Sequence, residues 1–222
     1  MTTKEIPSVI STLLERLGVE TLRPSQEKAI DAGLFEDNNI LVCTPTASGK
    51  TLVGEMAVYN SVLSKRKKGV YVVPLRALAS EKYSEFKKRY PQFKIALASG
   101  DIDSKDEYLS DFDIIITTSE KLDSLMRHKV SWLSKIGVLV IDEIHLLNDV
   151  TRGPTLEVLI TVLRRQLPSL QFIGLSATIG NAPELASWLD AKLVEDQWRP
   201  VRLEKGVLFD DAIYFPDEQK KK

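Results

Sequence analysis

Short runs of consecutive apolar residues alternate along this chain with stretches in which apolar residues recur every three or four positions. Runs of the first kind predict strands that are buried on both faces, and stretches of the second kind predict amphipathic helices. The predicted strands cover residues 40–43, 69–73, 94–98, 113–117, 138–141 and 172–175. Because helices are expected between most of them, the sequence predicts an α/β domain with a mostly parallel sheet and helices on both faces.

The N-terminal segment is predicted to be helical. Apolar residues from Ile6 to Leu17 recur at helical spacing, and Gly18 is suited to end that helix. A second helix is expected next, with Thr21 or Ser25 as its cap and Gln26 in its first turn. From its position alone, Gln26 is expected to face solvent.

The C-terminal segment departs from this pattern. From Trp198 onward no further α/β unit follows, and residues 201–203 and 206–209 are expected as short strands. We therefore expect a domain over residues 1–197, with a short helical lead-in, and a connection to something further over residues 198–222.

Composition narrows the possible classes of protein. The chain has 222 residues, of which 43% are hydrophobic, and this suits one large α/β domain or two small ones. Its 30 basic and 31 acidic residues give a net charge of −1, so overall charge does not indicate a nucleic-acid binder. The single cysteine and two histidines provide neither an internal disulfide nor a zinc-ligand set, which favours a reducing, cytoplasmic setting. No apolar run approaches the roughly 18 residues of a membrane span, and the N-terminus has no signal-peptide pattern.

The first candidate site lies between strand 40–43 and the helix that follows it. A strand, a tight polar loop and a helix N-terminus together present backbone N–H groups that attract phosphate. The expected phosphate ligands are the backbone of Thr46, Ala47, Ser48 and Gly49 and the ammonium group of Lys50. The hydroxyl of Thr51 is expected to hold Mg²⁺.

This loop does not meet the strict pattern G-x-x-x-x-G-K-[ST], because Thr44 occupies the position of the first glycine. A Gly-Lys-Thr sequence by itself also fits an ordinary solvent-exposed helix start. A second site elsewhere in the chain is therefore needed to decide between the two interpretations.

The second candidate site is a pair of carboxylates at the end of strand 138–141. Ligands of doubly wound sheets bind outside the carboxyl ends of the strands, so Asp142 and Glu143 should lie at the same edge as Lys50. There Asp142 can hold Mg²⁺ and Glu143 can accept a proton from an attacking water. In isolation, two acidic residues after a strand also fit a helix cap.

Six motifs in this order resemble the first motor domain of superfamily 2 helicases. They are Gln26, Pro45-Thr-Ala-Ser-Gly-Lys-Thr51, Pro74-Leu-Arg-Ala-Leu-Ala79, Thr117-Thr-Ser-Glu-Lys121, Asp142-Glu-Ile-His145 and Ser176-Ala-Thr178. The Asp-Glu-x-His form is similar to the Ski2-like branch. The sequences of residues 72–79, 117–125 and 174–178, together with Trp-Arg-Pro-Val at residues 198–201, resemble those of the archaeal Hjm-type DNA helicases, which act at branched and stalled replication forks. The resemblance implies a RecA-like fold, and it covers nearly the whole chain.

The resemblance also implies a role for each nucleotide-site residue. ATP and Mg²⁺ are the implied cofactors, and Gln26 is implied to read adenine, contrary to the solvent-facing expectation above. Lys50 and the adjoining loop backbone would hold the phosphates. Thr51 and Asp142 would position Mg²⁺, and Glu143 would be the general base.

Further residues are implied to connect the nucleotide to DNA. His145, Ser176 and Thr178 would couple the nucleotide state to the other motor domain. The residues implied to lie near the nucleic-acid path are Arg76, Gly100, Thr117, Thr118 and Glu120. The charge census gives this path no independent support.

The family resemblance implies partners that this sequence does not contain. A second RecA-like domain would bring arginines to the γ-phosphate, and an arginine of that kind typically accelerates hydrolysis by about 10³–10⁵. We therefore expect the 222 residues to be an N-terminal piece of a longer helicase that hydrolyses ATP very slowly by itself.

Three other functions remain open at this point. One is a Ski2-like RNA helicase, because these motifs do not distinguish RNA from DNA. Another is a module that binds nucleotide or nucleic acid without turnover, although the presence of Glu143 gives no sign of lost catalysis. The third is a self-contained P-loop kinase or small NTPase, which would need an arginine-rich lid that the sequence does not offer.

Overall fold

A seven-stranded parallel sheet forms the centre of the molecule, with strand order β3-β4-β2-β5-β6-β1-β7. The computed structural model describes residues 5–100, 106–204, 206–209 and 212–215. The strands are β1 Ile40–Cys43, β2 Lys68–Val72, β3 Ile95–Ala98, β4 Ile114–Thr117, β5 Ile136–Asp142, β6 Gln171–Ser176 and β7 Lys192–Glu195. The six strands predicted from apolar runs are all present in the sheet, so the predicted α/β class is confirmed.

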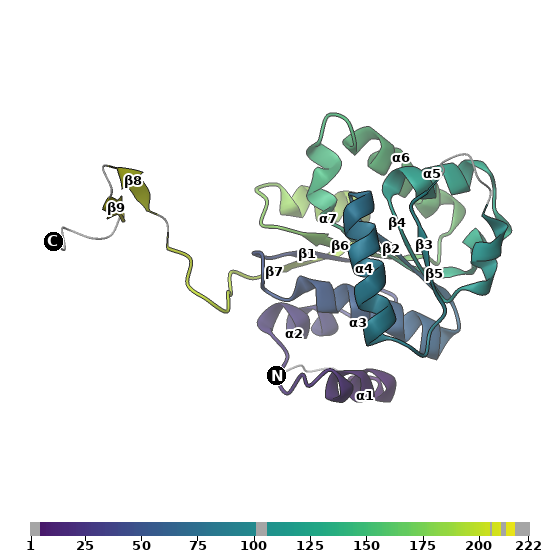
Figure 1. Cartoon of the computed structure of the whole chain (residues 1–222), viewed down its shortest axis with the longest axis horizontal. Coiled ribbons are helices and arrows are strands. Elements are labelled where there is room, and N and C mark those ends of the chain that lie inside the picture. The colour runs from purple at the N-terminus through teal and green to yellow at the C-terminus, as the bar shows by residue number, and fades with distance from the viewer. Residues whose placement is uncertain (1–4, 101–105, 205, 210–211, 216–222) are drawn as a thin grey trace.

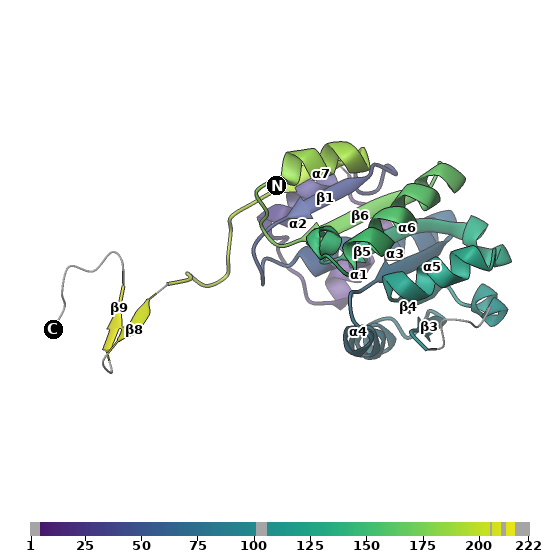
Figure 2. The ribbon, with the colours of Figure 1, turned by 90° about the horizontal axis from the view of Figure 1, so that it is seen from above.

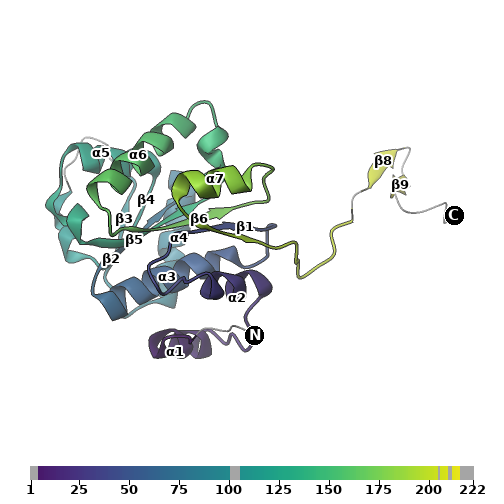
Figure 3. The same ribbon diagram turned by 180° about the vertical axis from the view of Figure 1, so that it is seen from behind.

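Helices cover both faces of this sheet, as Figures 1 and 3 show. One face carries α1 Ser8–Arg16, α2 Pro24–Asp31, α3 Lys50–Lys65 and α4 Arg76–Arg89. The other face carries α5 Ser119–Arg127, α6 Gly153–Gln166 and α7 Ala182–Leu189. None of the helices in the described ranges combines the length and apolar character needed to cross a membrane.

Each central strand is apolar throughout because it contributes to two cores. Along β1, Leu41 and Cys43 pack into the core beneath α5, α6 and α7. Ile40 and Val42 point to the opposite face and pack beneath α1, α2 and α3. All four residues are at most 2% exposed, which explains why the sequence shows a continuous apolar run instead of alternation.

Two predictions about the N-terminal helices meet different outcomes. Helix α1 ends as expected, because Gly18 adopts a left-handed backbone with φ of +66°. The predicted caps of the second helix, Thr21 and Ser25, are wrong. Arg23 is the capping residue, and the side chain of Gln26 accepts a hydrogen bond from its backbone N–H at 2.9 Å.

The C-terminal part also differs from the prediction. Residues 201–203 are not a strand; instead β8 Val207–Phe209 pairs with β9 Ala212–Tyr214 in an antiparallel hairpin. In Figure 2 this hairpin stands apart from the helices and the main sheet. The connection expected over residues 198–222 is described only as far as 204, over 206–209 and over 212–215.

Gly54 allows α3 to lie close to the sheet, and its replacement tests this packing. A Cβ atom at Gly54 would lie 2.8 Å from Val140 Cγ1 and 3.3 Å from the ring of Tyr71. Alanine in a helix ordinarily gains up to about 1 kcal/mol over glycine, whereas overpacking a core costs about 1–3 kcal/mol. We expect Gly54→Ala to lose about 1–2 kcal/mol of unfolding free energy, measured by urea denaturation.

Gly180→Ala is the matched control, because a Cβ atom there would have no neighbour within 4 Å. It should leave the urea midpoint unchanged. An equal or higher midpoint for Gly54→Ala than for the parent would show that α3 is free to move away from the sheet.

Candidate functional site

The loop between β1 and α3 has a backbone that only particular residues can adopt. Ala47 and Gly49 both have left-handed backbones, with φ of +63° and +91°. A Cβ atom at Gly49 would lie 2.6 Å from the side-chain nitrogen of Gln26, so glycine is required there. Alanine rarely adopts this conformation, and the strain at Ala47 indicates a loop that is held in shape by its surroundings.

Thr44 stabilises the loop in the absence of the first glycine of the strict motif. Its hydroxyl lies 2.7 Å from that of Ser48, and both side chains are buried. Its backbone N–H donates to the carbonyl of Ser176 at 3.2 Å, which ties the start of the loop to the end of β6.

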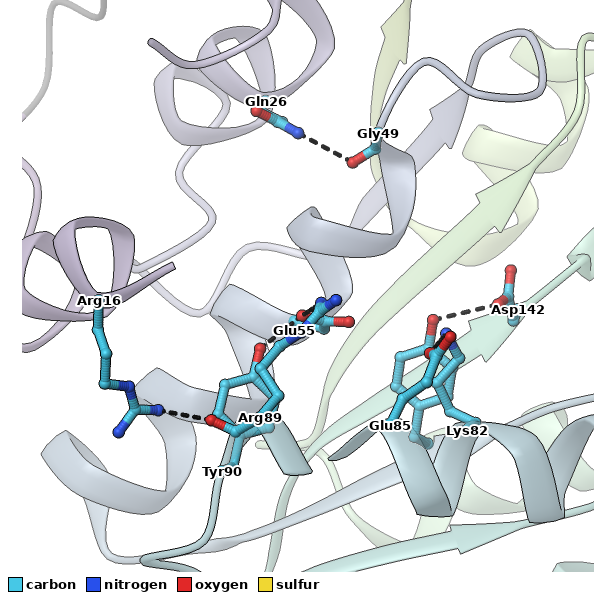
Figure 4. A network of polar contacts seen from close by, with 10 residues as sticks. Arg16, Gln26, Gly49, Glu55, Lys82, Glu85, Arg89, Tyr90 and Asp142 are labelled. Atoms are coloured by element: carbon cyan, nitrogen blue, oxygen red, sulfur yellow. Dashed lines mark hydrogen bonds and ion pairs between the residues drawn. The ribbon is translucent and has the colours of Figure 1, made fainter. Parts of the chain in front are cut away.

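Two side chains of the N-terminal segment donate hydrogen bonds to carbonyl groups of the loop. Gln26 donates from Nε2 to the carbonyl of Gly49 at 3.0 Å, and Arg23 donates from Nη1 to that of Ala47 at 2.7 Å (Figure 4 marks the first contact). Gln26 is only 3% exposed, so the prediction of a solvent-facing side chain is wrong. Position within a helix could not show this contact, because the two partners are 23 residues apart.

Backbone N–H groups of the same loop remain available. Within the described part of the chain, the amides of Ala47, Gly49, Lys50 and Thr51 have no backbone acceptor. Unpaired N–H groups at a helix N-terminus carry partial positive charge and bind anions. The loop therefore keeps unpaired N–H donors while its carbonyls at Ala47 and Gly49 are occupied by Arg23 and Gln26.

The carboxylates predicted at the end of β5 lie beside this loop. Lys50 Nζ is 3.6 Å from Glu143 Oε1, which confirms that the two predicted sites meet at one edge of the sheet. Glu143 also has a left-handed backbone, with φ of +53°. A non-glycine residue keeps such a backbone only where the surrounding structure holds it there.

The local charges are suited to a metal-bound polyphosphate. Lys50 is only 8% exposed, and among the described residues its ammonium group has just this one carboxylate contact, which is longer than a hydrogen bond. No group of three or more His, Cys, Asp or Glu that could hold a metal by itself occurs in the described ranges. Thr51 and Asp142 offer oxygen ligands of the kind that Mg²⁺ shares with phosphate and water. The residues present therefore fit ATP with Mg²⁺.

The predicted coupling residues are only partly brought together. His145 Nδ1 lies 3.3 Å from Glu143 Oε2 and 3.5 Å from Ser176 Oγ, so these three form a connected group. Thr178 lies two residues beyond the end of β6 and is exposed.

The predicted nucleic-acid residues fall into two groups. Arg76 and Gly100 are exposed, and Glu120 is half-buried in the first turn of α5. Thr117 is fully buried and donates its hydroxyl to the carbonyl of Ala98 at 2.7 Å, so its side chain ties β4 to β3. Thr118 caps α5, accepting a hydrogen bond from the N–H of Lys121.

Sequence reasoning missed an open cleft of about 650 Å³ beside the loop. It is lined by Gln26, Gly49 and Thr51 and, on α4, by Lys82, Glu85 and Arg89. Figure 4 labels these residues except Thr51. The spacing of the three α4 residues places them on one face of that helix, and that polar face was the available signal.

Comparison with known proteins identifies the fold and the family. A profile of the DEAD/DEAH box helicase family matches residues 23–185, which is most of the chain. The chain belongs to the DEAD/DEAH box helicase family. A crystal structure of the DUF1998 helicase MrfA bound to DNA superposes on this helicase domain with a TM-score of 0.73 and 28% identity. The match covers 89% of this chain and 30% of that one, and it confirms the RecA-like helicase fold.

Archaeal helicases are similar over nearly the whole domain. The ATP-dependent DNA helicase Hel308 of Methanococcus vannielii is 51% identical over 223 residues, covering 96% of this chain and 29% of the relative. Hel308 of Methanocaldococcus jannaschii is 54% identical over 214 residues, covering 93% of this chain and 18% of the relative. The helicase domain thus spans less than a third of the length of these relatives.

The burial of Asp142 gives the helicase domain a testable pH dependence. Burial, and then the neighbouring Glu143, raise the pKa of Asp142 above its ordinary value of 3.8. The folded state therefore binds this proton more tightly than the unfolded state, and stability is lost as pH rises through the folded-state pKa. We expect Asp142→Asn to gain melting temperature relative to the parent as pH rises from about 4 to 7, in buffer with EDTA.

Asp149→Asn should show the opposite trend, and in a lower range: the variant should gain melting temperature relative to the parent as pH falls from about 4 to about 2. Hydrogen bonds from the Thr151 hydroxyl and the backbone of Arg152 and Thr151 lower the pKa of Asp149 to about 2. That carboxylate contributes stability above its unfolded pKa and loses it in acid. For Asp142→Asn, a difference in melting temperature from the parent that stays the same at every pH would show that the pKa of Asp142 is not raised by folding.

Proposed function

We propose that this chain is the ATP-binding first motor domain of a DNA helicase that moves 3′ to 5′ and unwinds branched or stalled replication forks. The observation that carries the proposal is the 3.6 Å approach of Lys50 to Glu143 beside a loop with unpaired N–H groups. This arrangement places a positively charged site for anions and a pair of carboxylates close enough for one ligand to contact both.

In this proposal each residue acts on a different part of ATP. Lys50 and the loop amides bind the phosphates, and Thr51 and Asp142 hold the Mg²⁺. Bound Mg²⁺ supplies charge neutralisation for the reacting phosphates. Glu143 accepts the proton of the attacking water. His145, which contacts both Glu143 and Ser176, acts with Ser176 and Thr178 to couple the nucleotide state to the second motor domain.

The cleft beside Gln26 is the place that we assign to the base and sugar. Its walls are polar, and Gln26 keeps one amide hydrogen and one acceptor lone pair beyond its contacts with Gly49 and Arg23. The remaining donor and acceptor of Gln26 are complementary to the edge of adenine, which offers one donor and one acceptor.

DNA is the proposed nucleic acid because the similar archaeal proteins are described as DNA helicases. Arg76, Gly100, Thr118 and Glu120 are the proposed contacts. The predicted contact at Thr117 is not kept, because its side chain is fully buried and bonded to the carbonyl of Ala98. Contacts with phosphate would fix the path of the strand and not its sequence. RNA is the second candidate, since the motifs themselves suit either.

The remainder of the activity is assigned to other domains. Because the relatives are more than three times longer, we propose that a second motor domain and further C-terminal domains complete the ATPase and the strand channel, after the connection at residues 198–222. The 222 residues alone should then hydrolyse ATP very slowly, even with DNA.

Lys50→Ala tests the nucleotide site in the 222-residue chain. Loss of a charge-assisted contact with phosphate costs about 1.5–3 kcal/mol, so we expect Mg·ATP binding to weaken roughly 10-fold to 100-fold by calorimetry. Lys65→Ala, at the far end of the same helix, should bind as the parent does. Unchanged affinity for Lys50→Ala would rule out the proposed site.

Glu143→Gln tests the general base in the full-length gene product. The amide keeps the shape of the side chain but cannot accept the proton, so ATP should still bind while single-turnover hydrolysis falls about 10²–10⁴-fold. Glu157→Gln, exposed on α6, is the control. If cleavage persists in Glu143→Gln, another group is the base; if the parent itself binds but does not cleave, the protein is a non-hydrolysing binding module.

A further inference from the structure

Tyr71 of β2 reaches the carboxylate of Asp142 from the neighbouring strand. Tyr71 is fully buried, and its hydroxyl donates to Asp142 Oδ2 at 3.1 Å (Figure 4 marks a contact at this carboxylate). The other carboxylate oxygen, Oδ1, accepts from the backbone N–H of Glu143 at 3.0 Å. Two donors in different places therefore fix the plane of the Asp142 carboxylate.

The hydroxyl of Tyr71 must act as the donor in this contact. An ionised carboxylate can only accept hydrogen bonds, so the phenol donates its proton in a hydrogen bond to Asp142 Oδ2. Each carboxylate oxygen can accept more than one hydrogen bond or metal contact. The contacts with Tyr71 and Glu143 therefore orient Asp142 without using up its capacity to bind a cation or its water.

The ring of Tyr71 cannot easily turn away from Asp142. Gly54 of α3 lies close to it, since a Cβ atom there would be only 3.3 Å from the ring. Phe86 of α4 packs edge-on against it with ring centroids 5.4 Å apart, and Lys82 Nζ lies 5.9 Å from the ring centroid. Two helices thus hold the ring that carries the hydroxyl.

A buried tyrosine hydroxyl needs a hydrogen-bond partner, and the partner of Tyr71 indicates its role. Within the described residues its one hydrogen bond goes to Asp142, the residue proposed to hold Mg²⁺. Partners that orient metal-binding side chains are worth roughly 10-fold to 100-fold in metal affinity. Resting on the function proposed above, we infer that Tyr71 is a positioning residue that holds Asp142 toward the Mg²⁺ bound with the nucleotide.

Tyr71→Phe tests this inference, because it removes one oxygen atom and keeps the packed ring. Binding of ADP to the 222-residue chain is measured by calorimetry in EDTA and over a series of Mg²⁺ concentrations. We expect the half-saturating Mg²⁺ concentration to rise roughly 10-fold, while ADP affinity in EDTA stays the same. A purely structural loss would weaken binding in both conditions.

Tyr90→Phe is the matched control. Tyr90 is also buried and its hydroxyl also donates to a carboxylate, but the partner is Glu55 and not Asp142. Its Mg²⁺ dependence should equal that of the parent. In an Asp142→Asn background, Tyr71→Phe should have no further effect on Mg²⁺ dependence, since the group it orients is gone.

The outcomes separate this inference from the proposed function. If the parent binds Mg·ADP normally and Tyr71→Phe has the same Mg²⁺ dependence, the positioning role is overturned and the proposed function stands. The same conclusion follows if Tyr71→Phe still shifts the Mg²⁺ dependence in the Asp142→Asn background. If the parent shows no Mg²⁺-dependent binding of ADP, both the site and the role of Tyr71 fall together.

Discussion

An incompletely paired lysine faces two carboxylates at the carboxyl edge of the sheet, and the surrounding structure is organised to hold them there. Lys50 starts α3 directly after the loop, while Asp142 ends β5 and Glu143 follows it, two strands away from β1. The intervening strand, β6, ends at Ser176, which connects to both sides. A parallel sheet is what brings all three strand ends to one edge. Charges of both signs, held close but not neutralised by hydrogen bonds, favour a ligand that itself carries a cation and an anion.

The sequence was sufficient to predict the sheet and the main site because both depend on local patterns. Continuous apolar runs identify strands buried on two faces, and the residues after them are necessarily at the ligand edge. Strand β7 was missed because it lies at the edge of the sheet, where Lys192 and Glu195 are exposed and the pattern looks like a loop. The segment 201–203 was assigned as a strand on apolar character alone, and no neighbouring strand pairs with it in the described residues.

The contacts that sequence could not show are those between distant segments. Whether Tyr71 touches Asp142 depends on β2 lying next to β5, and strand order cannot be read from apolar runs. Likewise, Gln26 was placed correctly in the first turn of a helix, but nothing local indicates that it and Arg23 bind the carbonyls of Gly49 and Ala47. Side-chain contacts of this kind are set by packing in three dimensions, which a linear pattern does not encode.

The arrangement around the loop divides its polar groups by type. Arg23 and Gln26 are donors, and they satisfy the carbonyls of Ala47 and Gly49 from outside. If these carbonyls faced the ligand instead, their partial negative charge would repel phosphate. By binding these two carbonyls, the N-terminal segment leaves the loop with unpaired N–H donors beside Lys50. The left-handed backbone at Ala47 and Gly49 is the conformational cost of that orientation, and it is stabilised by the same two side chains.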